Sequence, residues 1–481
     1  MSSTLFIALP LLFGFISPLF SKFGKNTTAI VSTTMQLFLF LLSLSLLVDA
    51  KPYVEVISIN PPLGISFVLT KVSLFFVTLF TFLMLMFSLY YMSYRKTNPY
   101  KNETKFFILI NMLLASAVGL VLSSDIFNIY VFFEIAGISA YILSAYKKTP
   151  SALEAGIKYL LTGAIASVFL VFAIALIYLN IGSLNLAVIS LSFEELPHNV
   201  KILISILLLV GFGFKIEIFP LNFWVSDVYE GSSAHVNTLF SAIVVKAYLF
   251  VFFHILYLFL PSGEFSIFLI YLGAISMLVA EIVALKQTNL KRLFAYSSLG
   301  QIGLIFTAFA MQNQDGVQGA LYIIFAHSIA KTIIFLSLTT IGKKYNTYDI
   351  EVLKKLNSNF LKVVMLIAML SLLGIPLFAG FVGKFLTLKT LAVNGTFLAM
   401  GIILLASLLE AVYYFKLVGF MFVKNEVKEV LEINKTQKVI FASLAIILII
   451  VGTFPFVVSN FLLDSAGILL DNHSFITMLM H

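Results

Sequence analysis

The sequence predicts an all-α polytopic membrane protein with about fourteen transmembrane helices. The chain is 60% hydrophobic and only 11% charged, and its mean hydropathy is +1.06. A soluble chain of 481 residues could not bury so much apolar surface in domains of ordinary size. Apolar runs close to the about 20 residues that span a bilayer recur along the whole chain. Basic residues fill every second loop between these runs, as in multi-pass proteins.

Taken in order, the apolar runs define fourteen predicted spans. The first seven have the approximate limits 3–20, 28–48, 63–92, 106–123, 126–146, 158–180 and 202–219. The last seven have the limits 236–260, 265–285, 292–311, 317–341, 361–389, 396–422 and 438–462. We therefore divide the chain into helices 1–3, two sets of five helices, and a C-terminal loop with helix 14, at residues 1–105, 106–260, 261–422 and 423–481.

Two of these spans are interrupted in a similar way. The seventh contains Lys215 and Pro220, and the twelfth contains Gly374, Pro376 and Lys384. Proline removes a backbone donor and clashes with the preceding turn, so helices 7 and 12 are expected to be broken. Broken helices at matching places in two halves indicate an inverted repeat with an ion site near the middle of the membrane. We therefore predict that the two sets of five helices are inverted repeats.

The net charge of +8 is concentrated in alternate loops. These loops hold Lys22, Lys25, Arg95, Lys96, Lys101, Lys105, Lys147, Lys148, Lys286, Lys291, Arg292, Lys343, Lys344, Lys354, Lys355, Lys362, Lys424, Lys428, Lys435 and Lys438. By the positive-inside rule they face the cytoplasm, so both termini are expected outside a plasma (inner) membrane. This placement explains the charge without a nucleic-acid partner. One predicted cytoplasmic loop, 221–234, breaks the pattern with Asp227 and Glu230 and no basic residue.

Titratable residues inside the predicted spans give the clearest functional signal. A charge at the centre of a span costs roughly 2.5–3.5 kcal/mol, so it is expected to face a partner or water inside the bundle. Lys389, Glu281 and Lys416 lie near helix ends and are expected to extend toward the interface. Lys71 and Glu217 remain open. The predicted proton relay consists of Glu134, Lys215, Lys246, His327, Lys331, Lys384 and Glu410.

These residue types suit proton transfer. A buried lysine keeps its proton beside a carboxylate and releases it when the two separate, and histidine exchanges protons near neutral pH. Two alternatives remain: a self-contained secondary transporter of a small solute, because broken helices also build substrate sites, and a structural subunit with silent ion pairs. The chain has no cysteine, which excludes thiolate metal sites and iron–sulfur ligation. No metal or cofactor is expected.

Several motifs resemble those of the antiporter-like subunits shared by respiratory complex I, Mrp-type sodium/proton antiporters and energy-converting membrane-bound hydrogenases. The resemblance runs from PPLGISF at Pro61 to the thirteenth span. The motifs are DIFNIYVFFEI (125–135), EAGIKYLLTGA (154–164), GFGFKIEIFPLNFWVSDVYEG (211–231), LKRLFAYSSLGQIG (290–303), AHSIAK (326–331) and GIPLFAGFVGKF (374–385). Of the possible hosts, the D-type Mrp group with the hydrogenase-like assemblies is favoured.

The resemblance implies roles for matching residues. Glu134 and Lys215 correspond to the pair that gates proton uptake, and Lys246 and His327 to the connecting residues of the eighth and eleventh spans. Lys384 corresponds to the lysine that leads to the outward exit. Such subunits bind no redox cofactor and perform no redox chemistry of their own. They move protons, and in some relatives exchange them for Na⁺, together with other membrane subunits of a larger complex.

Overall fold

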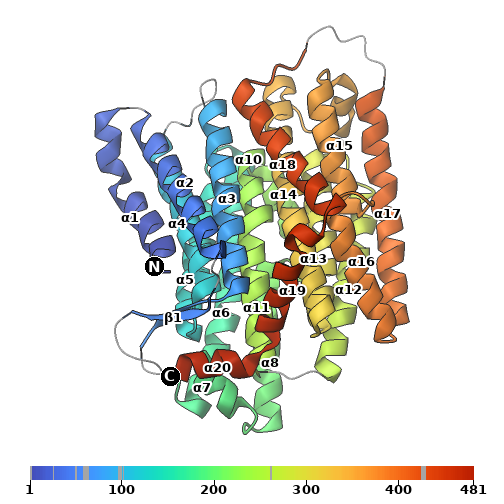
Figure 1. Cartoon of the computed structure of the whole chain (residues 1–481). Coiled ribbons are helices and arrows are strands. Elements are labelled where there is room, and N and C mark those ends of the chain that lie inside the picture. Colours follow the sequence, from blue (N-terminus) through green and yellow to red (C-terminus); the bar gives the residue numbers. More distant parts are fainter. Residues whose placement is uncertain are drawn as a thin grey trace.

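The computed structural model describes residues 3–24, 26–48, 51–57, 64–95, 100, 102–259, 263–423 and 430–480. These residues form a bundle of long helices that run side by side (Figure 1). The predicted loop residues Lys25, Lys96, Lys101, Lys424 and Lys428, and the first prolines of PPLGISF, lie outside the described residues.

The helices of the first half follow the predicted order. They are α1 (Leu5–Phe20), α2 (Thr27–Val48), α3 (Lys71–Tyr94), α4 (Glu103–Leu122), α5 (Ile126–Ser144), α6 (Pro150–Ile181), α7 (Leu186–Phe193), α8 (His198–Ile216), α9 (Val225–Gly231), α10 (Ala234–Leu239) and α11 (Val245–Phe259). A short 3₁₀ helix, η1 (Ser21–Phe23), follows α1, and a π-helical turn, η2 (Phe240–Val244), joins α10 to α11.

The second half contains α12 (Glu264–Ala284), α13 (Leu290–Ala310), α14 (Gln314–Tyr345), the 3₁₀ helix η3 (Ile350–Lys355), α15 (Asn359–Leu373), α16 (Ala379–Val393) and α17 (Phe397–Phe422). The C-terminal segment adds α18 (Lys435–Thr453), α19 (Phe456–Leu470) and α20 (Asn472–Met480). In the part of the chain that is described, thirteen helices are long and apolar enough to cross a membrane. The predicted span that is not among these thirteen is the twelfth, at 361–389, because it is divided into α15 and α16.

The all-α prediction holds apart from one hairpin. Strand β1 (Tyr53–Val56) pairs antiparallel with β2 (Ser66–Leu69), with Tyr53 opposite Leu69. Helix α3 therefore begins at Lys71 rather than at 63. Thr70 and Ser73 form a capping box at this helix start. In Figure 1, β1 and α7 both lie next to α20 at one end of the bundle, which we call the hairpin face.

The helices are interrupted near both predicted positions. Helix α8 ends at Ile216, and Glu217 takes the left-handed conformation with φ 68°, so the turn begins before Pro220. Helix α15 ends at Gly374, which has φ 78°, and α16 starts at Ala379. Each break leaves carbonyl groups without a helical partner at the end of a helix. Whether the two sets of five helices are related by inversion stays a prediction.

Candidate functional site

Lys215 lies in the last turn of α8, where only 1% of it is exposed. Its ammonium donates a hydrogen bond to the Tyr141 hydroxyl and lies 4.5 Å from the centroid of that ring. Glu134, one α5 residue that faces this region, is the carboxylate that acts electrostatically on Lys215. Its Oε1 is buried and makes no hydrogen bond within the described residues. Tyr141 is therefore the hydrogen-bond partner of Lys215, and Glu134 is its electrostatic neighbour.

Two glycines give this pair its space. The Lys215 Nζ lies 3.0 Å from the point that a Cβ would take at either Gly137 in α5 or Gly163 in α6. A Cβ at Gly163 would also overlap the Tyr141 hydroxyl. Because a side chain at either position must displace the lysine or the tyrosine, the close approach of α5, α6 and α8 depends on glycine here.

Lys246 has a carboxylate partner that the sequence left undecided. Lys246, on α11, is completely buried, and its ammonium has no hydrogen-bond partner among the described residues. Glu217, which is 2% exposed, is the acid that acts on Lys246. Tyr159 has both Tyr141 and Glu217 as electrostatic neighbours, and its ring centroid lies 4.8 Å from that of Tyr141. Glu217 therefore belongs to the polar site, although only its place beside the helix break could have indicated this.

His327 and Lys331 continue the polar site on α14. His327 is fully buried, and neither ring nitrogen has a hydrogen-bond partner in the described part of the chain. The charged groups that act on it are Lys246 and Lys331. The Lys331 ammonium donates to the Ser297 hydroxyl at 2.7 Å and to the Phe294 carbonyl at 3.0 Å. His327 and Lys331 are four residues apart on α14, and Lys246 of α11 is the second lysine that acts on the histidine.

Glu410 and Lys384 form the last pair. The Lys384 ammonium lies 3.3 Å from a Glu410 carboxylate oxygen, and the two side chains are 8% and 0% exposed. Lys384 also donates to the Leu373 carbonyl at 3.0 Å, and Gln301 donates to Glu410 at 2.8 Å. Glu410 and Glu281 are the two acids that act on Lys331. The structure thus brings Lys384 and Glu410 into direct contact, and the other predicted relay residues have the electrostatic neighbours named above.

The prediction for Glu281 was wrong. Its carboxylate is 0% exposed and accepts a hydrogen bond of 2.7 Å from the Tyr413 hydroxyl. A Cβ at Gly300 would overlap this carboxylate, which shows how tightly α12 and α13 approach there. Position near the end of a helix suggested an interfacial side chain, but the helix packing turns Glu281 into the bundle.

The other charged residues lie outside this site. Lys389 pairs with Asp315 at 2.8 Å with both side chains about half exposed, and Lys416 is exposed, so both follow the expectation for helix ends. Lys71, left open, pairs with Asp464 at 2.7 Å; the side chains are 31% and 56% exposed. This pair ties the start of α3 to α19.

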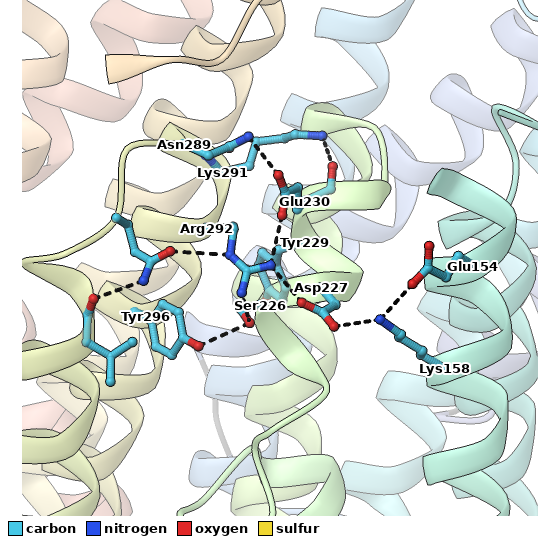
Figure 2. Close-up of polar contacts among 12 residues, drawn as sticks. Glu154, Lys158, Ser226, Asp227, Tyr229, Glu230, Asn289, Lys291, Arg292 and Tyr296 are labelled. Carbon is cyan, nitrogen blue, oxygen red and sulfur yellow. Dashed lines mark hydrogen bonds and ion pairs between the residues drawn. The ribbon is translucent and has the colours of Figure 1, made fainter. Parts of the chain in front are cut away.

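A second charged cluster explains the acidic loop 221–234 (Figure 2). Asp227 on α9 accepts from Lys158 of α6 and from Arg292 of α13, at 2.7 Å each, and Arg292 also reaches Glu230 at 2.8 Å. Partial burial alone would raise the pKa of Asp227, but the hydrogen bonds from Lys158 and Arg292 outweigh it and the pKa is lowered. The acids therefore compensate basic residues of neighbouring helices.

Comparison with known proteins agrees with this arrangement. Residues 123–410, more than half of the chain, match the transmembrane family described as NADH:quinone oxidoreductase/Mrp antiporter. The chain is 31% identical over 384 residues to NADH-quinone oxidoreductase subunit N of Desulfitobacterium hafniense, covering 74% of this chain and 77% of the relative. The relative of the same name from Bacillus anthracis is 29% identical over 406 residues, 79% of each chain.

Solved structures share the whole fold. A chain of the membrane-bound sulfane sulfur reductase, an archaeal respiratory membrane complex, superposes with a TM-score of 0.94 and 30% identity over 99% of both chains. A chain of the Mrp complex from Dietzia sp. gives a TM-score of 0.91 at 19% identity, covering 100% of this chain and 99% of that one, which shows the fold alone. The chain therefore belongs to the NADH:quinone oxidoreductase/Mrp antiporter membrane family, as an antiporter-like subunit of such assemblies.

Proposed function

We propose that this subunit moves protons across the membrane through the residues Glu134, Lys215, Lys246, His327, Lys331, Glu410 and Lys384. The observation that carries the proposal is the succession of buried lysines, each with an acid or a histidine as its neighbour. Isolated buried charges are expensive, so buried lysines that each have an acid or a histidine as a neighbour favour a transfer line over chance placement.

The chemistry is separation and re-pairing of charge. While Lys215 stays close to Glu134, the pair holds a proton; when they part, the lysine can release it toward Glu217 and Lys246. His327 can then accept at one ring nitrogen and release from the other, which passes the proton to the neighbourhood of Lys331. Glu281 and Glu410 receive it beside Lys384. The buried polar atoms without protein partners along this line support access of water.

The host and the membrane orientation follow as part of the same proposal. The subunit works with other membrane subunits of a multisubunit complex, in a plasma membrane with both termini outside, and it binds no cofactor and performs no redox chemistry itself. Exchange of these protons for Na⁺ is a further part of the proposal, with its own test below. The two breaks, beside Lys215 and before Lys384, support the assignment of 106–260 and 261–422 as inverted repeats.

The test replaces the first pair in the intact complex. Lys215→Ala and Glu134→Ala should each abolish proton pumping, followed with a pH-sensitive dye in inverted membrane vesicles, while the complex still assembles. Lys416→Ala is the matched control, because that lysine lies in a span but is exposed. Pumping at the wild-type rate by both assembled variants would instead favour silent structural pairs. Repeating the assay with Na⁺ replaced by K⁺ decides whether Na⁺ is exchanged.

A further inference from the structure

Two neighbouring cavities lie at the hairpin face. The outer cavity has a volume of about 430 Å³ and is lined by Asp471, His473 and Ser474 of the exposed turn before and within α20. The inner cavity, about 20 Å³, is large enough for a water molecule. Thr70, Ile468 and Phe475 line both cavities, so the two share part of their walls.

The inner cavity contains a histidine that the relay does not use. His254 lines it together with the hydroxyl residues Thr70, Ser73 and Ser123. Within the described residues the imidazole makes aromatic contacts, with ring centroids 4.7 Å from Phe475 and 5.5 Å from Phe250, and no hydrogen bond involves it. An imidazole beside a water-sized space and hydroxyl groups has a route for exchanging its proton with solvent.

Helix α11 connects this histidine to the relay. Lys246, Phe250 and His254 are four residues apart, so they lie along one face of the helix. The eight residues from Lys246 to His254 correspond to about 12 Å along the axis. Phe250 lies between them, is 2% exposed, packs on Phe76 at 4.7 Å and lines the inner cavity. Along this face of α11, Phe250 is the residue between the cavity and the lysine.

We propose that these cavities form a second passage for protons, which leads from Lys246 past Phe250 to His254 and out at the hairpin face. When the Phe250 ring turns aside, a water molecule can carry a proton from the Lys246 ammonium to the imidazole. His254 releases its other proton to water in the outer cavity, and Lys246 stays neutral until the relay reprotonates it. Among the described residues, those that line the inner cavity supply hydroxyl groups but no carboxylate, which favours a proton over Na⁺. The passage rests on the proposed function.

Access can be tested directly because the chain has no cysteine of its own. His254→Cys, Ser474→Cys and Ile255→Cys would be placed singly in the full chain within its complex, in membrane vesicles of either orientation. Silver ion, small enough for the inner cavity, is added outside, and blocked thiols are counted by alkylation after denaturation. Ser474→Cys marks the hairpin face, and Ile255→Cys is the buried control on another side of α11. We expect His254→Cys to react in the orientation in which Ser474→Cys reacts, and Ile255→Cys to stay unreacted.

Failure of His254→Cys to react, or reaction equal to that of Ile255→Cys, would overturn the passage. A second measurement follows passive proton leak through the resting complex. Phe250→Ala should increase the leak, His254→Phe added to it should remove the increase, and Phe253→Ala, a neighbouring buried phenylalanine, should leave the leak unchanged. An unchanged leak in Phe250→Ala also contradicts the proposal. Failure of the relay proposal would be recognised by a different result. The Lys215→Ala complex would then pump normally, whether or not the thiol of His254→Cys reacts with silver.

Discussion

Removing either member of the Lys384–Glu410 pair should destabilise the subunit strongly. The pair is buried, with the ammonium 3.3 Å from the carboxylate and exposures of 8% and 0%. Breaking a buried ion pair by deleting one partner leaves an uncompensated charge, which typically costs about 3–5 kcal/mol. We therefore expect Lys384→Met to lose stability near the upper part of this range, because the Glu410 carboxylate is completely enclosed. Glu410→Gln should lose less, because Gln301 can still donate to the new side chain and Leu373 still accepts from Lys384.

The double substitution separates stability from function. Lys384→Met with Glu410→Gln leaves neither charge unpaired, so its stability should return close to that of the wild type. Thermal unfolding of the purified complex, followed by the loss of this subunit, measures all four forms of the cycle. Proton pumping should stay absent in the double variant despite its recovered stability. If the destabilisations of the two single variants simply add in the double variant, the pair is not coupled and the reasoning fails.

Three further results are expected. Gly163→Ala should abolish pumping because its Cβ would overlap the Tyr141 hydroxyl and lie 3.0 Å from the Lys215 Nζ, whereas Gly401→Ala, with no atom within 4 Å, should pump normally. Glu217→Gln should slow pumping by leaving Lys246 without its acid; a wild-type rate would remove Glu217 from the relay. For Asp227, whose pKa is lowered in the folded state, the stability lost in Asp227→Asn should be constant above the ordinary pKa of 3.8. Below that pH the loss should shrink, and it should vanish only as pH falls through the lowered folded-state pKa, which thermal unfolding across pH 3–7 would begin to show. A loss of the same size at pH 3 as at pH 7 would refute the role of the Asp227 charge.

The sequence predicted the spans well because apolar run length is a local property. It failed where a side chain's surroundings come from distant segments. Lys71 pairs with Asp464, far along the chain, and no local pattern could reveal that contact. Glu281 occupies the end of its helix, but close packing at Gly300 turns it inward. The hairpin was missed for another reason. Its strands have only four residues, and β2 directly precedes a long apolar run, so the third predicted span included it.

The same limit applies to the relay residues. Residue type and distance from the span ends predicted which of them would be buried, but the residues that each of them contacts are decided by packing between helices. Tyr141 reaches Lys215 only because Gly137 and Gly163 leave room between α5, α6 and α8. The π-helical turn Phe240–Val244, of a kind that is frequent at functional sites, also has no signal in the sequence, and it ends two residues before Lys246.

The break between α15 and α16 gives Lys384, the last lysine of the proposed relay, a second acceptor. Lys384 has two acceptors, the Glu410 carboxylate and the Leu373 carbonyl, and the second is free because α15 ends at Gly374. The C-terminal end of a helix also carries partial negative charge, which favours an ammonium group. Lys384 can therefore turn away from Glu410 without losing all of its stabilisation. A continuous helix would use that carbonyl internally, and the lysine would have only one place to go. A relay that works by separating charges needs a second position for the lysine ammonium, and the interruption between α15 and α16 provides it.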